Sequence, residues 1–317
     1  MLALAAPLAP AAAQDARDRG TLSVTHENDT FGFTDRNYSS GLRVGWVTAE
    51  KRPAGPERAL VRVLAGERPA SLRRSYALGH SIFTPRDTFL RDAPPDQHPY
   101  AAYLRGEYGL VVEQADRLDR ASVQLGIVGP SAGGDWLQNG VHDLLGEAPV
   151  RGWDDQVGDE VVVSVAYDTQ RRVASRPMGS LTLDVVPSAG VRLGNFQTYA
   201  QAGALVRLAP AGGWGPPRIA PALPGVGVVR EGGTSWSVFA GGAARVVAHD
   251  ITLEGSFLDG DGDPSVEAER VVGDLQAGFT VRVLGADLAY THVLRTRTFE
   301  TQNGAHDFGS LTLSVLF

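Results

Sequence analysis

Short runs of alternating apolar and polar residues recur along the whole chain. The first run places Leu22 and Val24 on one face and Ser23 and Thr25 on the other. Because successive side chains of a strand point to opposite faces, this period of two predicts a β-strand with one apolar face. Similar runs lie near residues 42–46, 73–83, 100–114, 120–129, 158–170, 178–193, 196–208, 235–248, 267–283, 286–298 and 307–317. The pattern therefore predicts an all-β protein of about twelve strands.

The last run predicts how the sheet ends. Leu311, Val315 and Phe317 share one face, and serine and threonine occupy the other, so the chain finishes on an amphipathic strand with a terminal aromatic residue. An even number of such strands is typical of a single antiparallel transmembrane β-barrel. A soluble sandwich strand shows the same alternation, so the strand pattern alone leaves both open.

The N-terminal segment favours a transmembrane barrel over a soluble sandwich. Residues 1–13 carry no charge and end in three alanines, which is typical of the remnant of a signal peptide cleaved near Ala13. The alternative is a disordered Ala/Pro tail. We therefore expect one barrel domain over 14–317, exported to the bacterial outer membrane. No other stretch approaches the 18 uncharged apolar residues of a membrane-spanning helix.

The connections are rich in Gly, Pro and Asp. The four long ones, 51–69, 85–99, 209–233 and 258–265, predict long loops on one side of the barrel. A short apolar piece at 251–258 predicts a strand extension beyond the membrane band.

Composition narrows the function classes. The chain has no cysteine, which excludes disulfides, thiolate zinc sites and cysteine nucleophiles. A formal net charge of −7 argues against nucleic acid as a partner. In a barrel, the apolar content of 43% forms a lipid-facing band rather than a soluble core.

One segment, 133–147, departs from the strand pattern. Its apolar residues have helical spacing, which predicts a short helix between the fifth and sixth strands. This helix places Gln138 and His142 four residues apart on one face. A single helical histidine is more often structural than catalytic, so spacing alone does not assign a role.

Hard oxygen donors cluster at one predicted rim. Asn28 and Asp29 end the first strand, and Ser39 begins the second. These donors suit Ca²⁺, although the same residue types also favour simple turns. If Leu22 and Val24 face lipid, Asn28 lies on the same face, at the end of this strand.

Two motifs are decoys. Residues 129–133 match G-x-S-x-G, but an α/β-hydrolase needs alternating strands and helices that this chain lacks. Residues 259–263 begin like an EF-hand loop, yet Pro264 and Arg270 replace the glycine and glutamate that such a loop requires.

A set of ordered blocks carries a family resemblance. They are Glu27 to Phe31, Asp35 to Gly41, Phe83 to Pro85, Pro99 to Leu104, Gly129 to Gly133 with Gln138 and His142, Gly152 to Glu160, and, more weakly, Gly194 with Asn195. In this order the chain resembles the outer-membrane lipid A 3′-O-deacylase family of the LpxR type. The blocks cover about the first 200 residues, and the C-terminal third matches only as barrel strands.

The resemblance implies a calcium-dependent enzyme that hydrolyses the 3′ acyloxyacyl ester of lipid A, the membrane anchor of lipopolysaccharide, at the outer leaflet. We expect a monomer. The resemblance also implies His142 as the general base that activates water, with Ca²⁺ stabilising the oxyanion. The remaining positions that it implies are Asn28, Asp29, Ser39 and Gln138 as catalytic polar residues, Asn28, Asp29, Ser39 and Glu147 as metal ligands, and Arg86 and Arg91 as candidates for phosphate binding.

Three alternatives remain at this point. An outer-membrane phospholipase A would share calcium and ester hydrolysis. A non-catalytic pore or structural barrel would carry the same strands, and a soluble α/β-hydrolase built on the G-x-S-x-G motif is the last of the three.

Overall fold

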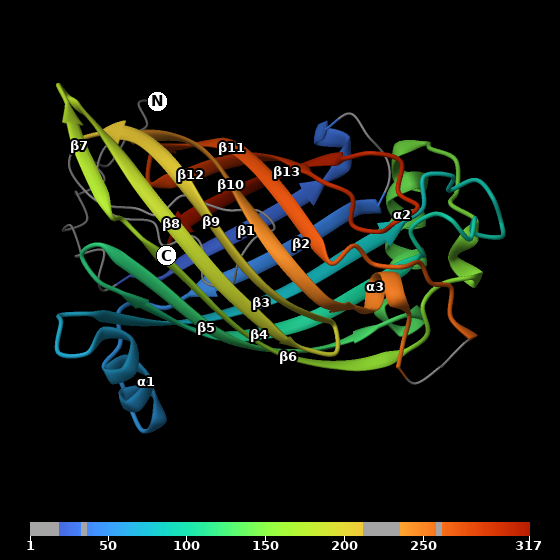
Figure 1. Ribbon diagram of the computed structural model, residues 1–317, viewed down its shortest axis with the longest axis horizontal. Coiled ribbons are helices and arrows are strands. Elements are labelled where there is room, and N and C mark those ends of the chain that lie inside the picture. The colour runs from blue at the N-terminus through green and yellow to red at the C-terminus, as the bar shows by residue number, and fades with distance from the viewer. Residues whose placement is uncertain (1–18, 33–36, 212–234, 258–261) are drawn as a thin grey trace, which may run out of the picture.

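The chain folds into one closed antiparallel β-barrel, seen from the side in Figure 1. It is a computed structural model that describes residues 19–32, 37–211, 235–257 and 262–317. The predicted signal-peptide remnant, 1–13, lies outside the described residues. The strands are β1 (Thr21–Asn28), β2 (Asn37–Val47), β3 (Ser71–Thr84), β4 (Ala101–Glu113), β5 (Arg117–Val128), β6 (Glu160–Arg171), β7 (Ala174–Met178), β8 (Leu181–Gly194), β9 (Gln197–Pro210), β10 (Ser235–Asp250), β11 (Val271–Val283), β12 (Ala286–Arg295) and β13 (His306–Leu316).

The prediction of a twelve-stranded barrel is confirmed. Each strand pairs with the next in sequence except β6, which pairs with β8 rather than β7, and β1 pairs with β13. The thirteenth strand arises because β6 and β7 pair with successive parts of β8, so the two together form one staggered wall strand. The pairing of β6 with β8 closes the sheet into a barrel, and of the described strands only the short β7 is paired on one side alone.

Alternation along each strand separates the two faces of the barrel. On β1, Leu22 and Val24 are exposed on the outside, whereas Thr25 and Glu27 are buried inside. The outer face carries a row of packed aromatic rings, Trp46, Tyr76 and Tyr108, on neighbouring strands β2, β3 and β4. An apolar exterior with interfacial aromatics and a polar interior is the organisation of a transmembrane barrel. No helix within the described ranges is long and apolar enough to span a bilayer.

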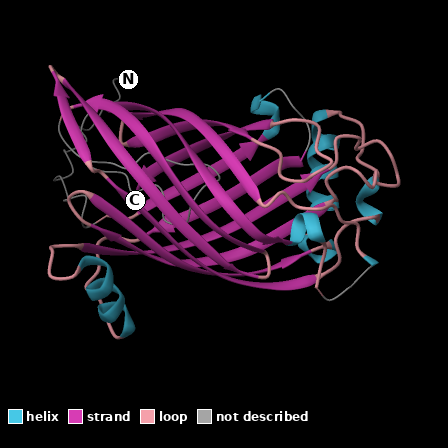
Figure 2. Ribbon diagram, viewed as in Figure 1, coloured by secondary structure: helices cyan, strands magenta, loops and turns pink. Residues whose placement is uncertain are grey.

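The helices lie at the two ends of the barrel (Figure 2). They are α1 (Pro56–Ala65), α2 (Gly134–Leu145) and α3 (Ile251–Glu254), with single 3₁₀ turns η2 (Asp29–Gly32), η3 (Pro130–Ala132) and η4 (Gly152–Asp154). We call the end with the C-terminus and α1 the terminal end, and the end with α2 and α3 the loop end (Figure 1). The helix predicted between the fifth and sixth strands is confirmed as α2.

Two predictions about the connections are wrong. The long connections do not share one side, because 51–70 lies at the terminal end and 85–100 at the loop end. The stretch 51–69 is also not all loop, because α1 packs Leu60 and Leu64 against Leu72, Leu110 and Val112 on the outer wall. Most of the predicted loop 209–233 and the first half of the predicted loop 258–265 lie outside the described residues.

The apolar piece at 251–258 is a helix rather than a strand extension. Asp250 caps it by accepting a hydrogen bond from the Thr252 backbone N–H at 3.0 Å. A bulge between Val247 and His249 shifts the register of β10 against β9 just before this helix, and the pairing ends at Asp250. The helix α3 then buries Ile251 beside Phe196 and Tyr103.

This apolar cluster closes the barrel interior at the loop end. The rings of Tyr103 on β4 and Phe196 after β8 stack with centroids 3.9 Å apart, although β5 and β6 separate their strands in the wall. Val128, Val157, Val162 and Ile251 bury against them. Below this cluster the interior surface is polar and charged.

Candidate active site on the outer wall

The helix α2 begins and ends at glycines. Gly133 precedes it with φ 73°, and Gly146 follows it with φ 74°, a left-handed conformation that glycine adopts without strain. The backbone N–H of Glu147 donates to the His142 carbonyl at 2.8 Å, which satisfies an otherwise free helix-end carbonyl. The sequence from 133 to 147 thus fixes a helix of three turns.

The helix lies on the outside of the barrel wall. Ile82 on β3 and Ala102 on β4 have the same strand parity as the exposed Leu78 and Leu104, so they face outward. They are nevertheless buried, because residues on both sides of α2, including Ala132 and Trp153, pack over them. The site therefore forms where the membrane-facing surface meets the loop end, and not in the lumen.

His142 is held in a defined tautomer. Its Nδ1 lies 2.8 Å from the carbonyl oxygen of Ala148, and a carbonyl can only accept a hydrogen bond. Neutral His142 therefore carries its proton on Nδ1 and presents a lone pair on Nε2. The Glu147 carboxylate lies 3.6 Å from Nε2 and stabilises an imidazolium once that nitrogen takes a proton. This is the arrangement of a general base.

Gln138 is oriented by an indole rather than by the histidine. Its Oε1 accepts a hydrogen bond from Trp153 Nε1 at 2.9 Å, which leaves the amide NH₂ as the group it can offer to a ligand. Sequence reasoning missed this contact, because Trp153 lies outside the helix and helical spacing cannot relate it to Gln138.

Asn139 is a residue that sequence reasoning missed. Its side chain accepts from the Val150 backbone N–H at 2.7 Å and donates to the Val150 carbonyl at 3.0 Å. These two bonds fasten the segment that carries Glu147 and Ala148 back onto α2. Asn139 therefore fixes the carbonyl that sets the His142 tautomer.

Two of the oxygen donors of the sequence analysis, Asn28 and Ser39, lie on the neighbouring strands β1 and β2, and the third, Asp29, follows β1 directly. Asn28 ends the outward column of β1, and its Oδ1 accepts from the Thr30 backbone N–H at 2.7 Å. Asp29 is fully buried at the start of η2. A bulge between Tyr38 and Ser40 lets the Ser39 hydroxyl reach Thr84 Oγ1, 2.5 Å away at the outward end of β3.

Strand β3 connects the group of Asn28 and Ser39 with the group of Gln138 and His142. It carries Thr84 beside Ser39, and it carries His80, whose Nε2 lies 2.9 Å from the Ala132 carbonyl at the foot of α2. No hydrogen bond in the described structure joins Asn28 or Ser39 directly to Gln138 or His142. The structure thus places both groups on one face and end of the barrel, with Glu147 grouped with His142.

The donor set agrees with calcium in its chemistry. Asn28, Asp29 and Ser39 offer an amide oxygen, a carboxylate and a hydroxyl, all hard ligands. Among the described residues, no three His, Asp or Glu side chains gather into a metal site, so any calcium here would draw on amide, hydroxyl and water oxygens as well.

Arg86 and Arg91 lie on the loop that follows β3, and both are exposed. Arg86 Nη2 is 3.3 Å from Asp87 Oδ2. A hydrogen bond from Gln97 lowers the pKa of Asp87, so this carboxylate is charged and offsets Arg86. Arg91 makes no ion pair with the described residues of this loop, so its charge is not offset in the same way.

The two decoy motifs have structural roles. Ser131 donates from Oγ to Asp159 Oδ2 at 2.6 Å, and no histidine contacts it among the described residues. Asp263 accepts from the backbone N–H of Gly158 and of Ser256, which ties two loops together. The all-β fold and the Ser131 contact exclude the α/β-hydrolase reading.

A glycine at the start of α2 gives a test of the helix position. A Cβ on Gly134 would overlap the Trp153 ring and would lie 2.6 Å from Ala102 Cβ, so Gly134→Ala must push α2 away from the wall. We expect a loss of hydrolytic activity of about tenfold or more, with the barrel still folded. The measurement is the rate of ester release beside heat-modified mobility on gels.

Gly140 is the matched control for this change. It lies on the same helix, and an added Cβ would meet no other atom within 4 Å. Gly140→Ala should stabilise the helix by about 1 kcal/mol and keep activity. Equal activity in the two variants would show that the close approach at Gly134 does not position the site.

Comparisons with known proteins identify the family and the fold. The family model described as outer membrane protein LpxR matches residues 1–317. Among solved structures, LpxR from Salmonella typhimurium superposes with a TM-score of 0.76 at 19% identity, covering 94% of this chain and 100% of that one. The β domain of the Bordetella autotransporter BrkA gives 0.45 at 9% identity, covering 94% and 97%. A search of curated protein sequences finds no match.

Proposed function

Because the chain belongs to the family of the outer membrane protein LpxR, which remodels lipid A in the bacterial outer membrane, we propose that it is a calcium-dependent lipid A 3′-O-deacylase. The observation that carries the proposal is the position of His142. Its tautomer suits a base, and it stands on the membrane-facing wall at the loop end rather than inside the barrel. An ester at the top of an acyl chain can reach such a site without leaving the bilayer.

The exposed face of α2 supports a lipid substrate. Trp136 is 79% exposed and Leu144 is 84% exposed on a helix that borders the apolar outer wall. Large apolar side chains left uncovered beside a membrane-facing surface mark a lipid-binding surface. Acyl chains that lie against the β1 column and this helix would bring their ester to the height of His142.

In the reaction we propose, His142 Nε2 takes a proton from water and the water oxygen attacks the ester carbonyl. The imidazolium is stabilised by Glu147. It then gives its proton to the sugar 3′ oxygen as the carbon–oxygen bond breaks, which releases the acyl chain as a carboxylic acid. Gln138 offers its amide NH₂ to the water or the carbonyl. Calcium held by Asn28, Asp29 and Ser39, with Glu147 as a further candidate, would polarise the ester carbonyl.

The direct test is product analysis. The purified barrel with Ca²⁺ and lipid A should yield lipid A that lacks the 3′ acyloxyacyl group, as measured by mass spectrometry. The same protein with glycerophospholipid vesicles should release no fatty acid. Release from the phospholipid and not from lipid A would replace the proposal with a phospholipase A.

The pore alternative has a structural argument against it. The stacked rings of Tyr103 and Phe196, together with Ile251, fill the described interior at the loop end. An open channel needs a water-filled path along its length. We expect no single-channel conductance in planar bilayers for the folded protein.

The phosphate-binding role of Arg86 and Arg91 gives a further prediction. Because Asp87 offsets Arg86, Arg91→Ala should raise the KM for lipid A more than Arg86→Ala does. One exposed phosphate contact contributes about 1 kcal/mol, so the expected rise is about fivefold, with kcat unchanged. Kinetics at two salt concentrations measure this. An unchanged KM in both variants would remove these arginines from substrate binding.

A further inference from the structure

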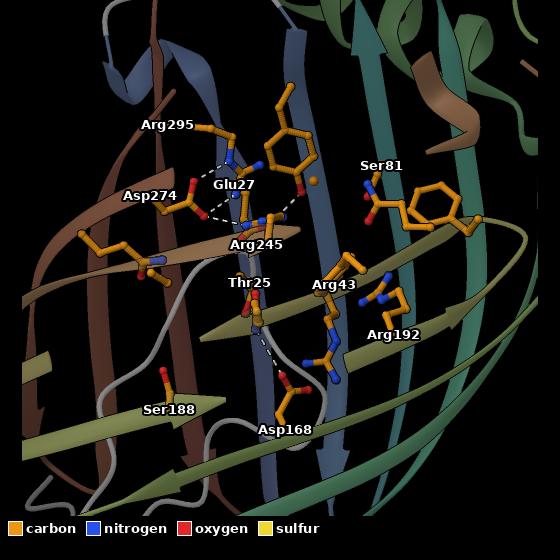
Figure 3. A pocket seen from close by; sticks show the side chains of 18 of the residues that line it. Thr25, Glu27, Arg43, Ser81, Asp168, Ser188, Arg192, Arg245, Asp274 and Arg295 are labelled. Atoms are coloured by element: carbon orange, nitrogen blue, oxygen red, sulfur yellow. Dashed lines mark hydrogen bonds and ion pairs between the residues drawn. The ribbon is translucent and has the colours of Figure 1, made fainter. Parts of the chain in front are cut away.

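The barrel interior holds a cavity of about 120 Å³ below the apolar cluster of the loop end. This is room for several water molecules or one small ion with its hydration. Figure 3 shows its lining, in which charged side chains from opposite parts of the wall point inward. Its arginines are Arg43, Arg105, Arg192, Arg245 and Arg295.

Most of these arginines share their carboxylates. Glu107 accepts from both Arg43, at 3.3 Å, and Arg105, at 3.0 Å. Asp274 accepts from both Arg245, at 2.5 Å, and Arg295, at 2.7 Å. In each group two arginines share a single carboxylate, so each group carries one positive charge in excess.

The remaining arginine, Arg192, increases this excess. It has no ion pair within the described part of the chain, and its Nε is buried without a hydrogen-bond partner. Its guanidinium lies over the Tyr199 ring at 5.7 Å. Two carboxylates lie within electrostatic reach of Arg192, Glu107 and Asp168, but it forms an ion pair with neither, and Arg43 and Arg105 already share Glu107.

The other two carboxylates that line the cavity each accept a hydrogen bond from a neutral group. Glu27 accepts from the Tyr38 hydroxyl at 2.7 Å, and Asp168 accepts from Gln201 at 3.3 Å. Together with Glu107 and Asp274 they make four carboxylates against five arginines among the described residues that line or flank the cavity. A buried donor without a partner and an excess of guanidinium groups both favour a bound anion.

We propose that this cavity is a binding site for a small oxyanion, of which inorganic phosphate is the test case, held chiefly by Arg192. The planar fork of a guanidinium matches two oxygens of a phosphate, and Arg43 offers a second buried Nε without a partner. The site is separate from the outer-wall site, since the strands of the barrel and the Tyr103–Phe196 cluster lie between them. It does not depend on the proposed function.

Isothermal titration calorimetry of the folded barrel in detergent tests this, with phosphate added at constant ionic strength. We expect saturable binding that sulfate competes with and chloride does not. Arg192→Gln should weaken the binding about tenfold or more. Arg282→Gln is the matched control, because Arg282 already pairs with Asp287 at 2.6 Å and does not line the cavity. It should bind phosphate as the wild type does.

Heat-modified mobility on gels shows whether each variant is folded. If Arg192→Gln does not fold, Arg192→Lys serves instead, since it keeps the charge and loses the fork, and weaker binding is again expected. No saturable heat in the wild type overturns the proposal. So does binding that the Arg282 change weakens as much as the Arg192 change.

Discussion

Replacing His142 with alanine is expected to lower the rate of lipid A deacylation about 10²- to 10⁴-fold, the usual contribution of a general base. The physical reason is that Nε2, whose lone pair is fixed by the Nδ1 contact with Ala148, is lost. The imidazole is partly exposed on a surface helix, so the barrel should fold without it. Mass spectrometry of product over time gives the rate, and gel mobility reports folding.

Asp143→Ala is the matched control for this result. Asp143 follows His142 directly on α2, and its side chain is exposed. Both variants place an alanine in the same helix, so the helix propensity of the new residue is the same in each. We expect it to keep near wild-type activity. Glu147→Gln should cause a smaller loss than His142→Ala, because the residue stabilises the imidazolium and does not itself take the proton. Full activity in His142→Ala would disprove the mechanism.

Removal of calcium is expected to lower the rate of lipid A deacylation by a factor similar to that of the His142 change. A Lewis acid at the ester carbonyl contributes several kcal/mol, so a strong chelator should reduce the rate about 10²-fold or more, and added Ca²⁺ should restore it. Asp29→Asn removes the one carboxylate of the Asn28, Asp29 and Ser39 set. It should raise the Ca²⁺ concentration that gives half-maximal rate.

The calcium dependence of the rate, measured at fixed lipid A, separates this effect from a loss of folding. Asp96→Asn is the control, because Asp96 is an exposed carboxylate on the 85–100 loop at the same end of the barrel. Its calcium dependence should match that of the wild type. A rate that neither chelator nor Asp29→Asn changes would show that the enzyme works without a metal.

The strands can be predicted from the sequence because their signal is local. Leu22 and Val24 alternate with Ser23 and Thr25, and the structure places them on the outer and inner faces as the alternation requires. The helix α2 is equally clear, because Gly133 and Gly146 bracket it. The error at 251–258 has the opposite cause: α3 forms through a cap at Asp250 and through burial of Ile251 beside Phe196, which lies 55 residues earlier.

The site is predictable only as a set of residue types. The sequence and its family resemblance indicate His142, Gln138, Asn28, Asp29 and Ser39, and the structure places them at one end of the barrel. Their partners could not be predicted, because Ala148, Trp153 and Thr84 act through tertiary contacts that no spacing shows. The helix α1 escaped prediction for the same reason, since it is stabilised by the outer wall of β3 and β4.

Lys51, the only lysine of the chain, has a practical consequence. It is exposed beside α1, where its backbone N–H pairs with the Leu72 carbonyl at the terminal end of the barrel. The proposed active site lies at the opposite end and contains no side-chain amine. Coupling through the Lys51 amine would therefore attach the barrel to a support at its terminal end, with α2 and His142 at the far end and chemically untouched.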